Sequence, residues 1–396
     1  LYFGWWVYLV RRRITEMHGL EEHDWENILQ RLPLSSIGEF MNPTGETWQD
    51  MLDHDTLDDH WKSLRFDKRY GHIDVPCLHV TGWYDMEDLT GAFHHYEHMM
   101  EASPARNNQR LIVGPWSHIN CRWPHSSYGG IEFGSEAAID MDEVHLRWFD
   151  YWLKGNQNGV PDDPPVKIFE PGKNAWLHTD HWPLGDKEKL LFLRFDGKTG
   201  DLSDVPPPTD DPEQSYRYNP VDPAPTRMDI KKYPLEDIPL DQTLVESRPD
   251  VLSYSSEALL EELVISGWPH LTIYAASNCE DTEWHVKITD VYPDGRSMKV
   301  TQGCLRASYR ESLEKPSRLV PGEIYTFDIE LWPTHHVFLS GHCVRVTITS
   351  SDFPWFARSM NRFGKIANLA APIVATNSIF HTPIYSSRLK LPVQQA

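Results

Sequence analysis

The sequence has little cysteine, little positive charge and no long apolar run, and each shortage excludes a class of protein. Its five cysteines include no Cys-x-x-Cys pair, so they fit free buried thiols better than a disulfide framework. Lysine and arginine total 37 against 58 aspartate and glutamate, which gives a net charge of −21. Such a charge would repel a phosphate backbone, so we expect no nucleic-acid partner. The sequence also has no glycine-rich phosphate loop, and nothing in it indicates a metal ion or an organic cofactor.

The longest apolar stretch, residues 2–10, ends at three arginines, whereas a membrane-spanning helix needs roughly 20 apolar residues. The positive charges follow this stretch, whereas in a signal peptide they precede it. We therefore expect no membrane association and no signal peptide in this sequence. Because it begins at Leu1 without methionine, we also expect an upstream segment; the location then stays open, with the cytoplasm favoured.

The length and composition are those of an ordinary globular protein. With 396 residues, 40% of them hydrophobic, the chain can form two or three domains that each bury a core. Residues 1–70 are predicted to be helical, because tryptophans and other apolar residues recur at helical spacings. These residues are Trp5, Trp6 and Leu9, followed by Trp48, Met51 and Leu52.

Residues 71–160 alternate between strand and helix patterns. Apolar runs at 75–80 and 110–113 predict buried strands, and each run ends at a glycine. Helices are predicted over 89–100 and over 141–152, where apolar residues are spaced three or four apart. This order is typical of a parallel sheet covered by helices.

Residues 155–165 are predicted to form a linker, and the pattern beyond them changes. Short strands with alternating polar and apolar residues predict a β-sandwich over 166–396. In one of them Trp284, Val286 and Ile288 alternate with polar residues, and the turn sequence 293–295 follows as a hairpin signal.

Two loops hold the candidate chemistry, each at the carboxyl end of a predicted parallel strand, where open α/β sheets place their sites. One ends in Asp85 and the other in His118. An aspartate beside a histidine fixes the tautomer of the ring and stabilises the imidazolium that forms when the ring accepts a serine proton. We expect the carboxylate within about 3.2 Å of Nδ1, with Nε2 facing open space. The alternative is a structural role for both residues: Asp85 could cap a helix, and His118 could be a polar residue whose hydrogen bonds are all made within the fold.

Six segments resemble, in unbroken order, successive signatures of one hydrolase family. They are 75–85 with Gly82-Trp83-Tyr84-Asp85, 113–118 with Gly114-Pro115-Trp116-Ser117-His118, 147–155, 290–295, 321–322 and 341–354. The family contains cocaine esterase, α-amino-acid ester hydrolases, glutaryl-cephalosporin-type acylases and X-prolyl dipeptidyl peptidases. The resemblance extends from near residue 1 to Leu391, which makes it specific.

The resemblance implies part of an α/β-hydrolase domain with a helical cap, followed by a jelly-roll β-sandwich. The cap would occupy 1–70, the carboxyl-terminal part of the hydrolase domain 71–160, and the jelly roll 166–396. The resemblance also implies that Asp85 and His118 are the triad aspartate and histidine.

The chain departs from this family at the nucleophile. The family places its serine in a Gly-x-Ser-Tyr-x-Gly turn upstream of the cap, and this sequence has no such string. Triads of this class run in the order Ser, Asp, His, and the residues before Asp85 are too few and too helical to supply the serine strand. We therefore expect the serine, and the oxyanion tyrosine, on an upstream segment. Ser127 mimics the motif only superficially, because His125 stands where glycine is needed.

Other residues near Asp85 and His118 are weaker candidates for contact with a substrate. Trp83, Tyr84 and Trp116 are predicted to line an acyl pocket, with burial in the core as the alternative. Glu87 could meet a substrate ammonium, although a solvated carboxylate is the simpler interpretation.

Neither of two histidine groups is predicted to bind a metal. His94 and His98 lack the glutamate that a zinc-protease helix requires after its first histidine. His335 and His336 are interpreted as a loop pair with no further ligands nearby.

The function expected from these features is hydrolysis of a small carboxylic ester or amide through an acyl-serine intermediate. His118 would be the base and then the acid, and Asp85 would orient it. The chain alone should be inactive, because it lacks the nucleophile. The competing hypothesis is an inactive binding protein whose sandwich holds a glycan or a protein. A homo-oligomer is compatible with either.

Overall fold

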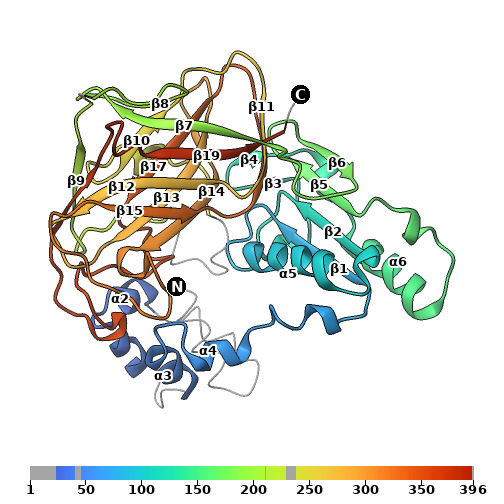
Figure 1. Cartoon of the computed structure of the whole chain (residues 1–396). Helices are drawn as coiled ribbons and strands as arrows, with labels where there is room; N and C mark the ends of the chain where they lie inside the picture. Colours follow the sequence, from blue (N-terminus) through green and yellow to red (C-terminus); the bar gives the residue numbers. More distant parts are fainter. Residues whose placement is uncertain (1–23, 41–45, 210, 229–237, 395–396) are drawn as a thin grey trace.

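A computed structural model describes residues 24–40, 46–209, 211–228 and 238–394 (Figure 1). Among them, no helix combines the length and the apolar character that crossing a membrane requires. Two parts stand out in Figure 1: a small sheet with helices beside it, and a larger unit built almost entirely of strands. The predictions for Trp5, Trp6 and Leu9 lie outside the described residues.

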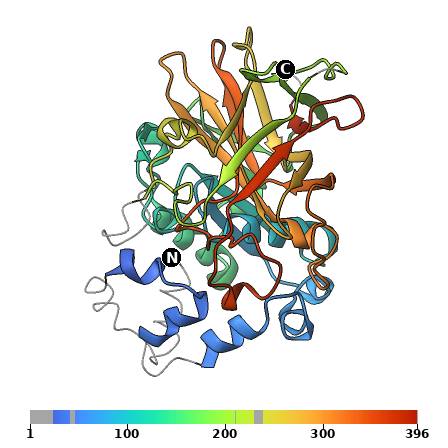
Figure 2. The same cartoon turned by 90° about the vertical axis from the view of Figure 1, so that its left-hand side faces the viewer.

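The regular elements described before residue 73 are all helices, as predicted. The elements are α2 (Trp25–Leu29), η2 (Leu34–Phe40), α3 (Glu46–Asp53), α4 (Asp59–Leu64) and η3 (Tyr70–His72). Leu52 packs with Ile28, Ile37 and Ala367 in a small core of its own. Since Ala367 belongs to the strand-rich unit, these helices rest on that unit, as the blue helices in Figure 2 do.

The small sheet confirms the strand–helix alternation. Its order is β1-β2-β5-β6, and its elements are β1 (Cys77–Gly82), α5 (Leu89–Ala102), η4 (Arg106–Asn108), β2 (Gln109–Gly114), α6 (Met141–Lys154), β5 (Val166–Glu170) and β6 (Ala175–Thr179). β1, β2 and β5 run parallel, and β6 is antiparallel to β5.

Alternate residues of β2 separate the two faces of this sheet. Leu111 and Val113 pack with Phe93 of α5, whereas Ile112 packs with Met141 of α6. Successive side chains of a strand point to opposite faces, so the two helices cover opposite sides. The segment between β2 and α6 holds η5 (Ile119–Cys121), the short hairpin of β3 (Ser127–Tyr128) and β4 (Ile131–Glu132), and η6 (Ser135–Ala137).

The sheet continues across the predicted linker, which contains η7 (Val160–Asp162). β5 pairs with β2 and β6 pairs with β5, although both strands fall in the range 166–396 that the sequence assigned to the sandwich. Their short alternating pattern did not distinguish them from the sandwich strands that follow.

The larger unit is one hydrogen-bonded system of thirteen strands. They are β7 (Lys187–Phe195), β8 (Gly200–Ser203), β9 (Gln214–Tyr218), β10 (Leu252–Ser255), β11 (Leu263–Gly267), β12 (His270–Ser277), β13 (Glu283–Val291), β14 (Ser297–Arg306), β15 (Tyr325–Glu330), β16 (Thr334–Phe338), β17 (Cys343–Thr349), β18 (Ala375–Ile379) and β19 (Arg388–Val393). The same part of the chain holds α7 (Thr243–Glu246), η8 (Ala307–Tyr309) and η9 (Ile366–Asn368). Residues from all thirteen strands share one hydrophobic core.

The hairpin predicted at 293–295 is confirmed, since β13 and β14 pair antiparallel across it. The alternation predicted for β13 is only half right, because its polar residues are buried too. Lys287 Nζ donates to Asp352 at 2.9 Å and to Gln242 at 3.1 Å, and Thr289 donates to Glu246. The segments after β9 and β17 therefore cover a face that the sequence pattern assigned to solvent.

Candidate functional site

Two glycines bring the ends of β1 and β2 together. Gly82 and Gly114 are register partners at the last position of each strand. A Cβ on Gly82 would lie 2.1 Å from the carbonyl oxygen of Trp116, and one on Gly114 would lie 2.2 Å from the Trp116 ring. Such distances leave no room for a side chain, so glycine is required for the close approach of the two loops.

Backbone hydrogen bonds continue past the strands and hold the loops in register. The N–H of Trp83 donates to the carbonyl of Gly114 at 2.9 Å, and the N–H of Tyr84 donates to Trp116 at 3.0 Å. Asp85 directly follows Tyr84, and His118 comes two residues after Trp116. The parallel pairing thus places Asp85 and His118 beside each other.

Asp85 is held rigidly by its own loop. Its side chain is only 4% exposed, and Oδ1 accepts the backbone N–H groups of Glu87 and Asp88, both at 3.0 Å. Asp88, and not Asp85, occupies the N-cap position of α5. The carboxylate therefore organises the turn before the helix and still directs Oδ2 at the histidine.

His118 meets three carboxylates. Nδ1 lies 3.4 Å from Asp85 Oδ2 and 3.5 Å from Asp88 Oδ2, while Nε2 lies 3.3 Å from Glu87 Oε2. The predicted pairing of Asp85 with Nδ1 is present, although the distance exceeds the expected 3.2 Å. The expectation that Nε2 faces open space is wrong in this structure, because Glu87 occupies that side.

The carboxylates raise the pKa of His118 to about 9 from its ordinary 6.5. The hydrogen bond to Asp85 is the largest cause; burial opposes it, and the charges of Asp85, Glu87 and Asp88 add to it. At neutral pH this ring is therefore protonated and can donate but not accept a proton. A general base must be neutral and must have a free nitrogen, whereas here Asp85 favours the charged ring and Glu87 lies on Nε2.

The sequence alone did not anticipate Glu87 and Asp88 as partners of His118. Glu87 was interpreted as solvated, yet its side chain is only 12% exposed. The signal was present in the run Asp85-Met86-Glu87-Asp88, because three acidic residues within one turn after a strand must lie near the same strand end.

The structure buries the three aromatic residues predicted to line an acyl pocket. Trp83 stacks on Phe93 and donates its indole N–H to the carbonyl of Phe169, and Tyr84 stacks on Tyr128. Trp116 is 1% exposed and donates to the carbonyl of Ala137. This packing fits the core alternative, and a pocket role for them stays a prediction.

Ser127 lies in the β3–β4 hairpin, where it pairs with Glu132. A nucleophile turn would place the serine between a strand and a helix, so the structure agrees with its exclusion. The interpretation of His335 and His336 as a loop pair is wrong. Both lie buried in β16, where His335 contacts Glu170 at 3.0 Å and His336 contacts Asp290 at 3.1 Å.

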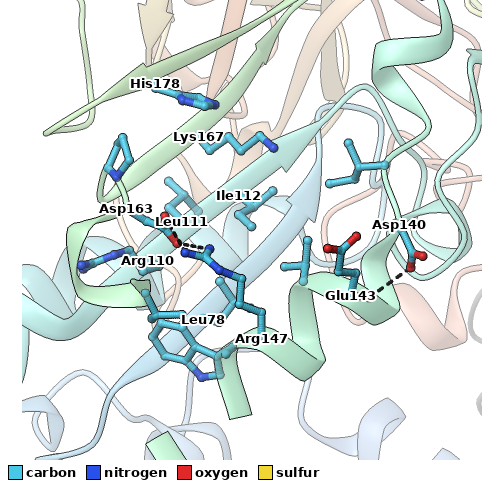
Figure 3. Close-up of a pocket in the computed structure, with 15 residues that line it drawn as sticks. Leu78, Arg110, Leu111, Ile112, Asp140, Glu143, Arg147, Asp163, Lys167 and His178 are labelled. Carbon is cyan, nitrogen blue, oxygen red and sulfur yellow. Dashed lines mark hydrogen bonds and ion pairs between the residues drawn. The ribbon is translucent and has the colours of Figure 1, made fainter. Parts of the chain in front are cut away.

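A pocket of about 350 Å³ lies between α6 and the small sheet (Figure 3). Leu78 and Ile112 contribute apolar floor, and Arg147 reaches Asp163 across it. Neither Asp85 nor His118 lines it. The pocket is therefore separate from Asp85 and His118, and these two residues do not show what it would bind.

Two family models match this chain. Residues 158–390 match the X-Pro dipeptidyl-peptidase C-terminal non-catalytic domain, and residues 13–120 match the X-Pro dipeptidyl-peptidase (S15 family). Asp85 and His118 lie in the second of these ranges.

Individual relatives agree with the family models. Cocaine esterase of Rhodococcus sp. (strain MB1 Bresler) is 32% identical over 356 residues, which cover 87% of this chain and 60% of that protein. An α-amino acid ester hydrolase structure superposes with a TM-score of 0.83 at 29% identity, covering 93% of this chain and 64% of that one. The structure of an aminopeptidase from a marine sediment archaeon (Thaumarchaeota archaeon) superposes with a TM-score of 0.83 at 26% identity. The match covers 94% of this chain and 64% of that one. The chain thus spans about three fifths of the length of these relatives.

Proposed function

Since the chain belongs to the family of X-Pro dipeptidyl peptidases, cocaine esterase and α-amino acid ester hydrolases, we propose that it carries the aspartate and histidine of a serine hydrolase triad. One observation carries this proposal. Asp85 and His118 meet at the carboxyl ends of two adjacent parallel strands, with the carboxylate on Nδ1 of the ring. That is the geometry in which an aspartate orients a catalytic base.

The chemistry of the pair follows from this orientation. Asp85 holds the Nδ1 proton, so Nε2 of the neutral ring accepts the hydroxyl proton of a serine as that oxygen attacks the ester or amide carbonyl. The imidazolium then returns the proton to the departing alcohol or amine, and an acyl-serine remains. Water attacks the acyl group with His118 again as base, which releases the acid and restores the serine.

The serine is proposed to lie on a segment upstream of this chain, as in a protein of the relatives' length. Within the described residues the outer edge of β1 has no strand partner. The outward side of α6 also exposes an apolar row, Leu146, Phe149 and Leu153. A strand and a helix from such a segment would pair with this edge and cover this row, because unpaired edges and apolar rows are normally protected.

The finer fold assignment belongs to the same proposal. The small sheet with α5 and α6 fits the carboxyl-terminal part of an α/β-hydrolase domain, and the helices before residue 73 fit its cap. The strand-rich unit fits a jelly roll, whose strands share one core. Among ester, β-lactam and peptide substrates, we propose the class of small carboxylic esters and amides and no narrower one.

The competing hypothesis is an inactive binding protein. It is favoured if the upstream reading frame lacks a serine turn of the type Gly-x-Ser-Tyr-x-Gly. Finding that turn favours the enzyme, since the pair described here then has a nucleophile to serve.

The kinetic test uses the chain joined to its upstream segment and a panel of chromogenic esters and amides. His118→Gln should lower hydrolysis by several orders of magnitude, because a glutamine side chain cannot take the serine proton. His125→Gln, an exposed histidine seven residues away, is the matched control and should leave turnover unchanged. Hydrolysis that survives His118→Gln would refute the triad.

A further inference from the structure

A second cluster of histidines and carboxylates lies among the N-terminal helices, upstream of the small sheet that carries Asp85. It consists of Asp50 in α3, His54 just after that helix, and His60 in α4. His54 Nε2 lies 3.6 Å from Asp50 Oδ1, and His60 Nε2 lies 3.6 Å from Asp50 Oδ2. One donor atom from each of the three residues falls within 4.8 Å of the others.

The ring of His54 is oriented by a further carboxylate. Its Nδ1 lies 2.5 Å from Asp58 Oδ2, while Asp58 Oδ1 accepts the backbone N–H of His60 at 3.0 Å. Asp58 therefore caps α4 and fixes the position of His54 at once. A carboxylate on one ring nitrogen, with the other nitrogen turned towards further ligands, is the usual support of a metal-binding histidine.

We propose that Asp50, His54 and His60 bind a zinc ion. Two imidazole nitrogens and one carboxylate oxygen are a ligand set that suits Zn²⁺, with water in the fourth position. The side chains of all three residues are partly exposed, so an ion can enter and can keep its water. The sequence pattern did not predict this site, because its two histidines are six residues apart and become neighbours only when the chain turns between α3 and α4.

A bound zinc ion would replace protons on the ring nitrogens of His54 and His60. The two rings are stacked, with centroids 4.3 Å apart and planes 12° apart. Parallel rings cannot both aim a lone pair at one ion, so His60 must turn about its side-chain bonds when zinc binds. Binding also requires the neutral rings and is therefore weakened by acid.

Zinc at this position would join α3 to α4. The same helices already contact the strand-rich unit through Lys365 on Asp53, Lys62 on Glu314, and the Tyr309 hydroxyl on the carbonyl of Asp55. An ion that joins the two helices would therefore also strengthen their attachment to that unit.

The test titrates the metal-free chain with zinc at neutral pH, in competition with a chromogenic chelator. One ion should bind per chain, and bound cobalt should give the visible absorption of a four-coordinate site. His60→Asn and Asp50→Asn should each weaken binding strongly, and Asp58→Asn should weaken it by about tenfold through loss of the orienting hydrogen bond. Circular dichroism and a thermal melt of each metal-free variant check that it folds.

Two other places could hold zinc and serve as controls. His118→Gln removes the ring that lies with Asp85 and Asp88, the other described group of donor atoms with metal-binding spacing. His94→Asn and His98→Asn remove the i,i+4 pair of α5. These variants should bind zinc as the unaltered chain does. Absence of stoichiometric binding, or binding that survives His60→Asn and Asp50→Asn, would overturn the proposal, and so would binding that depends on His118 or on the α5 pair.

Discussion

Two histidines of this molecule each face a carboxylate, and their surroundings change their proton affinities in opposite directions. His118 lies at the strand ends of the small sheet with 29% of its side chain exposed, and its pKa is raised to about 9 chiefly by the hydrogen bond to Asp85. His335 is fully buried in β16 beside Glu170 of β5, and burial lowers its pKa more than Glu170 raises it. A histidine–carboxylate pair thus favours the protonated ring at a partly open strand end and the neutral ring in the core.

The largest effect expected from this contrast is on catalysis. In the chain joined to its upstream segment, Asp85→Asn should leave folding intact and lower turnover roughly 10⁴-fold, because the ring loses its orienting carboxylate. Asp88→Asn is the matched control: its carboxylate lies at nearly the same distance from Nδ1 but is exposed, so most of the turnover should remain. A kcat for Asp85→Asn above about a tenth of the original would remove Asp85 from the triad.

In the strand-rich unit, neutralising a carboxylate that contacts histidine should lower the stability of the fold. Asp290 is buried and contacts both His336 at 3.1 Å and His342 at 2.8 Å. Asp290→Asn should lower the free energy of unfolding by about 3 kcal/mol, since two buried rings lose the charge that they share. Denaturant titration measures this loss. Asp294→Asn, at an exposed turn of the same hairpin, should change stability little, and an equal loss in both variants would contradict the assignment.

The pH dependence of stability should differ in sign between the two histidines. The pKa of His118 rises on folding from 6.5 to about 9, so the folded state holds a proton more tightly. Its contribution to stability should be fully present below pH 6.5 and lost as the pH rises through about 9. The difference in unfolding free energy between the unaltered chain and His118→Gln, measured across that range, should shrink towards high pH. A flat difference would contradict the raised pKa.

His335 should show the reverse. Its pKa falls on folding from 6.5, because burial disfavours the charged ring. The unfolded chain then binds the proton more readily, so the contribution of His335 to stability is present above pH 6.5 and lost as the pH falls below it. Compared with His335→Gln, the unaltered chain should therefore lose stability in acid. An advantage that instead grows as the pH falls would mean that the buried ring is charged.

The smallest expected effect is that of Glu87 on the pKa of His118. Its charge adds to that of Asp85 but ranks below it among the causes of the raised pKa. Glu87→Gln should lower the pKa of His118, measured by NMR titration of the ring, by less than Asp85→Asn does. If Glu87→Gln has the larger effect, then Glu87 and not Asp85 is the main partner of the ring.

The sequence predicted that Asp85 and His118 are neighbours, because parallel strands impose that proximity. Once 75–80 and 110–113 are recognised as adjacent strands, the residues after their final glycines must be neighbours, and β1 and β2 confirm this pairing. The same reasoning failed where burial comes from distant segments. Lys287 and Thr289 alternate with apolar residues as solvent-facing side chains would, yet segments from elsewhere in the chain cover them.

Local pattern also could not separate the two sheets. β5 and β6 resemble the later strands in length and alternation, and only their pairing with β2 assigns them to the small sheet. Glu87 illustrates the same limit at the scale of one side chain. Its position two residues after Asp85 is visible in the sequence, but its approach to Nε2 depends on the turn that Asp85 Oδ1 stabilises.

The central claim is that Asp85 and His118 serve a serine that lies outside this chain, and covalent labelling tests it most directly. The chain alone and the chain joined to its upstream segment are each treated with a fluorophosphonate, and labelled serines are located by mass spectrometry. The account predicts no labelled serine in the chain alone and one labelled serine, upstream of residue 1, in the joined protein. Stoichiometric labelling of any serine between residues 1 and 396, Ser127 above all, would contradict it.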